Sequence, residues 1–248
     1  MNNQEKISIK DRIMNPSDLV DDQGAKILIY GAAGAGKTTL CATAPGKILV
    51  IDMESGLLSV KDRTDIDVIQ VKQASEIMEI YQMLRQGELS YDTVCLDSIS
   101  EMSEILLQQE KEKLKDPRMA YGNVQESVTN VMRSFRDLHM NVVFVSKMEK
   151  QNVDNVMMFE PKMVGTKLGQ SITYFFDEVL ALRVIEDQDD DGVTIRNRWL
   201  QTDVGHGYTA KDRSGKLDDF EEANLTNVIA KLGFNTNKII REEVQTDE

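Results

Sequence analysis

The sequence has little of what several kinds of protein and site require. It contains two cysteines, two histidines and four prolines among 248 residues. The cysteines form no CxxC pair, so neither a disulfide scaffold nor a cysteine zinc site is expected, and two distant histidines do not favour a histidine cluster. Apolar runs such as Ile27–Tyr30 and Val142–Val145 are far shorter than the roughly 20 residues that span a bilayer. With no basic and apolar leader at its start, we expect a cytoplasmic chain without membrane contact.

The chain is also poor in basic residues, with 29 Lys and Arg against 42 Asp and Glu and a formal net charge of −13. A protein that coats duplex DNA through bulk electrostatics is normally basic, so the composition argues against a passive nucleic-acid coat. Local DNA-binding loops remain compatible with this charge, because exposed charges interact weakly beyond the Debye length of about 8 Å in cellular salt. A content of 41% hydrophobic and 29% charged residues is typical of a globular domain.

Short apolar runs rich in β-formers alternate with helical patterns from residue 26 onward. The predicted strands are 26–30, 48–52, 67–71, 93–97 and 141–146, and the predicted amphipathic helices are about 74–85, 100–115 and 124–138. This alternation predicts an α/β fold with a mostly parallel sheet. Two later runs, 177–185 and 193–202, predict a β-hairpin extension, and 221–232 has a weak helical pattern. The expected divisions are an N-terminal arm (1–24), a core (25–210) and a C-terminal turn, helix and acidic tail (211–248).

A phosphate-binding motif follows the first predicted strand directly. The segment Gly31-Ala-Ala-Gly34-Ala-Gly36-Lys37-Thr38 fits GxxxxGK[ST], the P-loop, and a helix is predicted after it. Glycines let backbone N–H groups approach phosphates, and the helix offers them its positive N-terminus. Lys37 is expected to reach the β- and γ-phosphates, and the Thr38 hydroxyl to bind Mg²⁺. The predicted cofactors are ATP and Mg²⁺, and the predicted nucleotide-binding residues are Gly31, Ala32, Ala33, Gly34, Ala35, Gly36, Lys37, Thr38 and Thr39. A glycine-rich turn without a ligand is the alternative.

Two further strand ends carry carboxylates that suit ATP hydrolysis. Asp97 ends the run 93–97 and is expected to hold Mg²⁺ through water; alternatively, it caps the helix that follows. The next position, which is a glutamate in many P-loop ATPases, is Ser98. The general base must then come from elsewhere, and Glu54, at the end of the second strand, is the best candidate. The alternatives are a solvated Glu54 and an Asp52 that only caps a turn.

Together these motifs resemble the RecA-like ATPase core. The resemblance rests on the P-loop, the Asp-x-Glu segment 52–54 and the run Val94-Cys-Leu-Asp97-Ser98, and it covers residues 25–210. In that family the glutamate of Asp-x-Glu is the catalytic base, which implies this role for Glu54. The size and the segment 208–215 look most like the short phage-encoded Sak-type annealing proteins of the AAA family. The resemblance implies ATP hydrolysis coupled to single-stranded DNA binding in recombination or strand annealing, in the cytoplasm of a bacterial host.

The resemblance also implies a γ-phosphate sensor and two DNA-binding loops. Ser146 and Lys147 occupy the sensor position, where glutamine or a similar residue is usual. The stretch 108–124 looks like the first DNA loop, and 148–164 looks like the second. Basic groups can track a strand while an aromatic ring stacks on a base, and the candidate DNA contacts are Lys111, Lys113, Lys115, Arg118, Tyr121, Lys150 and Lys162. Because acidic residues alternate with the first four, a solvated helix face is the alternative.

Neighbouring subunits are expected to complete the site. RecA-like ATPases place it at a subunit interface, which implies self-association into a ring or filament. Charge on a transferred phosphoryl group needs a further cation, and no arginine lies close in sequence to the P-loop, Glu54 or Asp97. Lys211 and Arg213 are the candidates that would act in trans. Ordinary surface charges are the alternative for both.

Two other functions compete with this interpretation. The first is a nucleotide-gated regulatory module that acts through protein partners without DNA, which the negative charge favours. The second, a small-molecule kinase, would need an arginine-rich lid that the sequence lacks. The turn Asp187-x-Asp189-x-Asp191-Gly192 matches half of an EF-hand loop, but the twelfth position is Arg198 rather than glutamate, so calcium is not expected. No NKxD motif distinguishes GTP from ATP.

Overall fold

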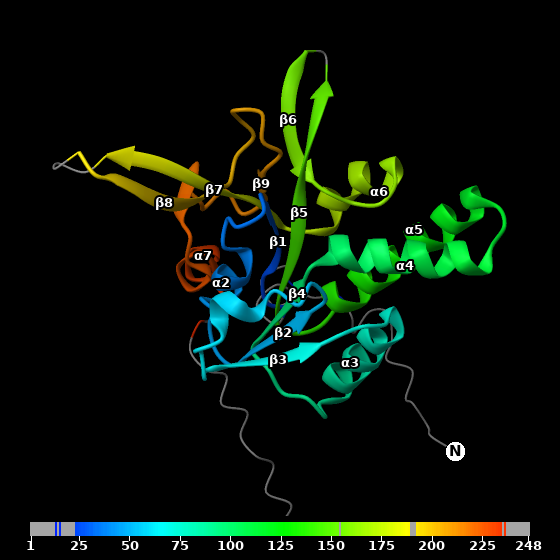
Figure 1. Ribbon diagram of the computed structural model, residues 1–248. Coiled ribbons are helices and arrows are strands. Elements are labelled where there is room, and N and C mark those ends of the chain that lie inside the picture. The colour runs from blue at the N-terminus through cyan, green and yellow to red at the C-terminus, as the bar shows by residue number, and fades with distance from the viewer. Residues whose placement is uncertain are drawn as a thin grey trace, which may run out of the picture.

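A ten-stranded sheet forms the centre of the protein in a computed structural model that describes residues 13, 15, 23–153, 155–188, 192–234 and 236. The strand order is β10-β8-β7-β1-β5-β4-β2-β3, with β6 paired to β5 and β9 paired to β7 (Figure 1). The strands are β1 (Lys26–Gly31), β2 (Ile48–Asp52), β3 (Ile66–Gln70), β4 (Thr93–Asp97), β5 (Asn141–Val153), β6 (Val156–Pro161), β7 (Glu178–Gln188), β8 (Thr194–Gln201), β9 (Lys211–Asp212) and β10 (Phe220–Glu222).

The strands of the segment β3-β2-β4-β5-β1-β7 pair parallel with one another. The remaining strands pair antiparallel: β6 with β5, β8 and β9 with β7, and β10 with β8. The α/β class predicted from the sequence, with a mostly parallel central sheet and a β-hairpin extension, is confirmed. The five predicted strands and the 177–202 hairpin are present. Because parallel strands all point the same way, their carboxyl ends bring residues distant in sequence to one edge.

Helices cover both faces of the sheet, and the strand residues alternate between two apolar clusters. On β1, Leu28 and Tyr30 belong to the larger cluster, whereas Ile27 and Ile29 belong to the smaller one. The larger cluster packs against α3 (Ala74–Gln86), α4 (Ile99–Lys113) and α5 (Pro117–Arg136), and the smaller one against α2 (Lys37–Cys41) and α7 (Leu225–Leu232). Central strands that are buried on both faces need the continuous apolar runs seen in the sequence. Short helical segments η2 (Leu57–Val60), α6 (Thr166–Ser171) and η3 (Ile172–Phe175) complete the fold.

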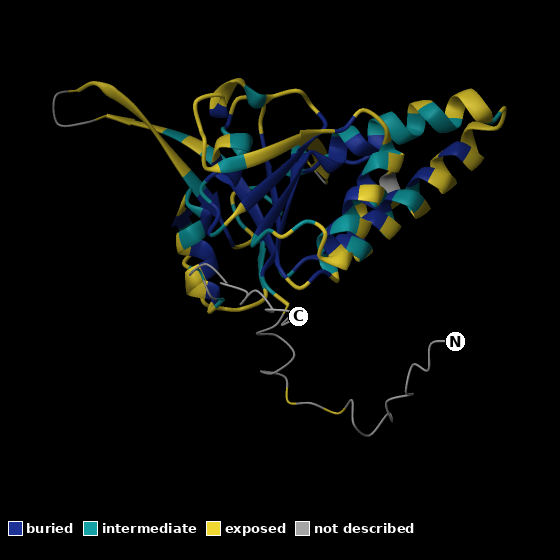
Figure 2. Ribbon diagram, turned by 90° about the horizontal axis from the view of Figure 1, so that it is seen from below, coloured by how far each residue is buried: buried dark blue, intermediate teal, exposed yellow. Residues whose placement is uncertain are grey.

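Two β-hairpins project from this body (Figure 1). β5 continues past the central sheet to Val153 and pairs there with β6, and the β7–β8 hairpin extends outward over Arg183–Gln188 and Thr194–Arg198. Burial falls away along both, from buried residues at the base to exposed ones further out, as Figure 2 shows for the β7–β8 hairpin. We call these hairpins the β5–β6 arm and the β7–β8 arm.

Both segments expected to be DNA loops are regular structure instead. The stretch 108–124 consists of the end of α4 and the start of α5, joined by a short turn at 114–116. Asp116 caps α5, with its side chain accepting from the amide of Arg118, and Pro117 is the first helical residue. The stretch 148–164 is mainly the β5–β6 arm, in which ladder hydrogen bonds order a polar sequence. The helix expected over 221–232 starts late, because Phe220–Glu222 forms β10.

Some expectations lie outside the described residues. These include most of the N-terminal arm, positions 189–191 of the acidic turn and the acidic tail after 236. The described residues of the C-terminal division pack on the sheet through α7, whose Leu225, Val228 and Ile229 are buried. Over the part of the chain that the structure describes, no helix combines the length and apolar character needed to cross a membrane.

Candidate nucleotide site

The P-loop connects the end of β1 to the start of α2, as its sequence predicts. Gly34 and Gly36 have φ values of 75° and 100°, the left-handed region that side chains disfavour. The Lys37 side chain folds back across the loop, and its ammonium donates to the carbonyls of Gly31 at 3.2 Å and Ala32 at 3.1 Å. These contacts hold a cation over the backbone amides that would surround a phosphate chain.

Thr38 and Asp97 meet at the carboxyl edge of the sheet. The Thr38 hydroxyl donates to Oδ2 of Asp97 at 2.6 Å. Asp97 is 4% exposed, and burial raises the pKa of its carboxyl, which the hydrogen bond from Thr38 lowers and the nearby charge of Glu54 raises. A hydroxyl and a carboxylate are ligands that suit Mg²⁺. A buried carboxylate with a raised pKa is also a group whose charged form a cation would stabilise, so these residues fit the metal.

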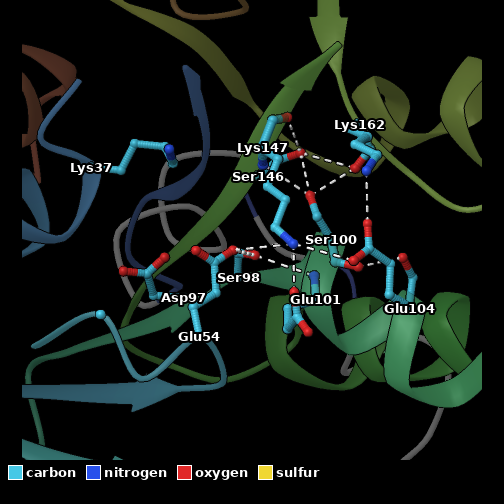
Figure 3. A network of polar contacts seen from close by, with 12 residues as sticks. Lys37, Glu54, Asp97, Ser98, Ser100, Glu101, Glu104, Ser146, Lys147 and Lys162 are labelled. Carbon is cyan, nitrogen blue, oxygen red and sulfur yellow. Dashed lines mark hydrogen bonds and ion pairs between the residues drawn. The ribbon is translucent and has the colours of Figure 1, made fainter. Parts of the chain in front are cut away.

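Asp52 and Glu54 differ in what they contact. Asp52 is 3% exposed and accepts hydrogen bonds from the amides of Glu54 at 3.1 Å and Gly56 at 3.5 Å, so it fixes the turn after β2. Glu54 accepts a hydrogen bond from the Ser98 hydroxyl, and its carboxylate lies 3.9 Å from the Lys147 ammonium. Ser98 also caps α4, accepting from the amide of Glu101 at 3.2 Å. Glu54 therefore lies at the same edge as the Thr38–Asp97 pair, within a polar network (Figure 3).

The two sensor candidates lie in different surroundings. Ser146 is fully buried, and its hydroxyl lies 3.0 Å from that of Ser100 and donates to backbone carbonyls. Lys147 is opposite Gly31 in the β1–β5 pair, and its ammonium contacts Glu101 and, at 3.2 Å, Glu104. Partial burial lowers the pKa of Lys147, but the hydrogen bonds to both glutamates outweigh it and raise the pKa overall. Only Lys147 of the pair therefore presents a charged group to the site (Figure 3).

The sequence of the chain matches the model of one protein family, described as an AAA domain, over residues 23–214. The chain belongs to this family. The match spans the P-loop, Glu54, Asp97 and both arms, and it identifies an ATPase domain with an ATP-binding site. No curated protein matches the chain. Among solved structures, a KaiC-like protein from the hyperthermophilic archaeon Pyrococcus horikoshii OT3 is similar, with a TM-score of 0.42 and 12% identity over 72% of this chain and 79% of that one.

The AAA domain carries the candidate DNA contacts on two projecting elements. Lys111, Lys113, Lys115 and Arg118 are all exposed around the α4–α5 turn, and the Lys111 ammonium lies 5.6 Å from the centre of the Tyr121 ring. On the β5–β6 arm, the Lys150 ammonium lies 5.6 Å from the Phe159 ring. Lys162, at the base of this arm, pairs instead with Glu104 at 2.8 Å. The elements are folded differently from the expected loops, but the residues remain accessible.

The two trans candidates have local partners within the AAA domain. The Lys211 ammonium donates to the carbonyls of Thr173, at 2.9 Å, and Phe176. Arg213 pairs with Asp177 at 2.6 Å. β9 pairs with the start of β7, which lies at the amino end of the parallel strands, whereas the P-loop lies at their carboxyl end. Within one subunit, these two residues are therefore on the opposite edge of the sheet from the nucleotide.

An arginine that was not among the predicted site residues contacts the P-loop. Nε of Arg198, on β8, donates to the carbonyl of Ala35 at 2.9 Å, although 163 residues separate them. A Cβ on Gly36 would lie 3.0 Å from the same nitrogen, so the guanidinium packs directly against the loop. No sequence signal marks this contact, because it depends on β7 and β8 extending the sheet next to β1. The sequence draws attention to Arg198 only through the EF-hand comparison, in which it occupies the position where a calcium loop would need a glutamate.

Proposed function

We propose that this ATPase domain hydrolyses ATP in a Mg²⁺-dependent reaction with Glu54 as the general base. The observation that carries the proposal is the Thr38–Asp97 hydrogen bond of 2.6 Å beside the P-loop. It brings together the hydroxyl that would bind Mg²⁺ and the carboxylate that would hold it through water, and the metal would neutralise charge on the phosphates. Lys37 and the amides of the loop bind the phosphate chain, and Thr38 and Asp97 hold the metal site.

Glu54 then orients the attacking water and takes its proton. Its carboxylate already accepts from Ser98, which leaves the second oxygen to receive the water's hydrogen bond. The Lys147 ammonium lies 3.9 Å from the same carboxylate and belongs to the polar network around it. Asp52 is the weaker candidate for this role, because its carboxylate is engaged by the backbone of the turn.

We further propose that hydrolysis is coupled to single-stranded DNA in phage-type recombination or strand annealing. The supporting observation is the pair of cation–aromatic contacts, Lys111 with Tyr121 and Lys150 with Phe159, on two projecting elements. Such pairs can bind a phosphate and stack on a base. Lys147 and Lys162 share Glu104, which connects the nucleotide edge to the base of the β5–β6 arm. A nucleotide-gated module acting through protein partners remains the second candidate, favoured by the net charge of −13.

The experiment that tests this function measures ATP turnover with Mg²⁺, with EDTA, and with added single-stranded DNA. Turnover that needs Mg²⁺ and rises with DNA supports the whole proposal. Mg²⁺-dependent turnover that DNA leaves unchanged favours the regulatory module, and absence of turnover under all conditions contradicts hydrolysis.

Self-association is part of the proposal, with Lys211 and Arg213 acting on a neighbour's nucleotide. Their position at the opposite edge of the sheet suits a head-to-tail arrangement, in which one subunit's amino edge meets the next one's P-loop. Mixing Glu54→Gln subunits with subunits carrying Lys211→Ala and Arg213→Ala should then restore some turnover. Specific activity that stays constant on dilution into a demonstrated monomer range contradicts the shared site.

A further inference from the structure

The charges around the nucleotide site leave it short of positive charge. Asp97 and Glu54 lie next to the P-loop, and Glu101 and Glu104 engage the ammonium of Lys147. Lys37 is then the cation that the P-loop itself supplies. A strongly negative phosphate chain needs further positive charge, both to bind and to stabilise charge that develops during transfer.

Arg198 lies where it could supply this charge from the same subunit. Arg198 lies on β8, directly opposite Val184 of β7. The backbone carbonyl of Arg198 accepts a hydrogen bond from the amide of Ala223 at 3.4 Å, which helps to fix its position. The side chain crosses to the P-loop and bonds the Ala35 carbonyl at 2.9 Å through Nε. The ideal Cβ position on Gly36 lies 3.8 Å from the central carbon of the guanidinium.

The Nε contact leaves the two terminal nitrogens of Arg198, which have no hydrogen-bond or ion-pair partner among the described residues. The two other arginines of the β7–β8 arm are engaged elsewhere. Arg183 donates to Gln201 at 2.8 Å, and Arg196 pairs with Glu186 at 2.8 Å. Arg198 is exposed, and a guanidinium with unused donors is well suited to a phosphate oxygen.

The P-loop and the β7–β8 arm leave space between them. A cavity of about 300 Å³ is lined by Ala32–Ala35 of the loop and by Leu182–Val184 of β7. Val184 is the cross-strand partner of Arg198, so the arginine lies next to this space. The cavity thus lies between the loop that Arg198 contacts and the strand that pairs with its own.

We propose that Arg198 is a nucleotide-binding residue, supplied in cis by β8, whose guanidinium contacts the phosphate chain held by the P-loop. The inference rests on the proposed function, since it requires that the P-loop binds ATP or ADP. It also means that the β7–β8 arm is tied to the nucleotide state, because its own strand supplies a ligand.

The test is isothermal titration calorimetry of the full chain with Mg²⁺–ADP and with the non-hydrolysable analogue adenylyl imidodiphosphate. Removal of a charge-assisted contact in Arg198→Ala should weaken binding by about tenfold or more. Arg198→Lys keeps the charge and should retain part of the affinity. Arg196→Ala is the matched control, because it removes a positive charge two residues away that pairs with Glu186 instead of the loop, and it should bind as the wild type does.

Arg198→Gln separates a phosphate contact from a brace on the loop. Its amide can still donate to the Ala35 carbonyl, but it carries no charge. Affinity as low as in Arg198→Ala supports the phosphate contact, whereas wild-type affinity in Arg198→Gln means that bracing is sufficient and overturns the proposal. Wild-type affinity in Arg198→Ala overturns it as well. If the wild type binds neither nucleotide, both the inference and the proposed function fail; if it binds and Lys37→Ala does not, a negative result concerns Arg198 alone.

Discussion

The Thr38 hydroxyl and the Asp97 carboxylate form a 2.6 Å hydrogen bond across 59 residues of sequence. It connects the first turn of α2, which follows β1, to the end of β4. In the strand order, β5 lies between β1 and β4. The two residues that we propose for the metal site thus lie in contact, so that nucleotide binding would have little reorganisation to drive at this point.

Asp97→Asn should raise the stability of the protein on its own and remove most of the stabilisation that added Mg²⁺ and ATP give. Burial raises the pKa of Asp97, which means that the ionised carboxyl is less favourable in the folded than in the unfolded chain. Removing the charge should raise the melting temperature, by about 2–4 °C for each kcal/mol regained. Added Mg²⁺ and ATP should then stabilise the variant far less than the wild type.

Thermal melts with and without Mg²⁺ and ATP check this prediction, with Asp92→Asn as the control, because Asp92 directly precedes β4 and lies at the end of the strand opposite Asp97. Asp92 accepts from the amide of Lys47 instead. Full Mg²⁺-dependent stabilisation of Asp97→Asn would contradict its role as a metal ligand.

Glu54→Gln should bind ATP and Mg²⁺ normally but turn over at least about 100-fold more slowly, as for loss of a general base. The glutamine keeps a carbonyl oxygen that can accept from Ser98, so the turn should be preserved. Single-turnover kinetics separate binding from hydrolysis. Unchanged turnover would move the role to Asp52 or to another residue.

The parts of this site that could be predicted from sequence are those that local patterns encode. The P-loop needs glycines at fixed spacing, and Asp97 follows an apolar run that only a buried strand explains. The contact between Arg198 and Ala35 could not be predicted, because it depends on where two late strands join the sheet. Burial of Ser146 likewise depends on Ser100 and on the carbonyl of Lys162, which come from two other elements.

The two segments that resemble DNA loops differ in how clearly their own sequences indicate regular secondary structure. Asp116 and Pro117 are a strong pair of helix-start residues, and the polar residues on either side are good helix formers, so the sequence itself favoured helices over 108–124. For 148–164 the local signal was weak. Polar and apolar residues are mixed in Lys147–Val153, and pairing with β6 decides the structure.

Glu178→Gln should make the protein more stable, increasingly so toward alkaline pH. Burial, together with Asp212 and Asp177, raises the pKa of Glu178 from 4.5 to about 8, and its Oε2 has no hydrogen-bond partner among the described residues. The folded protein therefore holds a proton that the unfolded chain loses between these values, so this group's contribution to stability falls as pH rises from about 4.5 to about 8.

Melting temperatures of both proteins from pH 5 to pH 9 test this expectation. The difference between variant and wild type should grow with pH and level off above about 8. Lys26, whose pKa burial lowers to about 7, titrates in both proteins, and the comparison removes its effect. A difference that is constant across the range would mean that Glu178 does not hold its proton.

Single-stranded DNA binding should depend on the basic residues around the α4–α5 turn. If the basic residues around the α4–α5 turn bind phosphates, replacing Lys111, Lys113, Lys115 and Arg118 with alanine should weaken binding. It should also flatten the dependence of log affinity on log salt by about 0.7 for each phosphate that is no longer neutralised, because each neutralised phosphate releases a condensed counterion. Fluorescence anisotropy with a labelled oligonucleotide at several salt concentrations measures both quantities.

A matched variant is needed because removing four positive charges from an acidic protein weakens DNA binding through long-range repulsion alone. Lys47, Lys61, Lys72 and Arg85 are also exposed, and they lie on the β2, η2, β3 and α3 side of the molecule. Replacing them changes the net charge equally, so a direct-contact role requires that the α4–α5 variant lose clearly more salt dependence than this control. Equal slopes in the two variants would return Lys111 and its neighbours to an ordinary solvated helix face, with Lys113 paired to Glu110 at 2.9 Å.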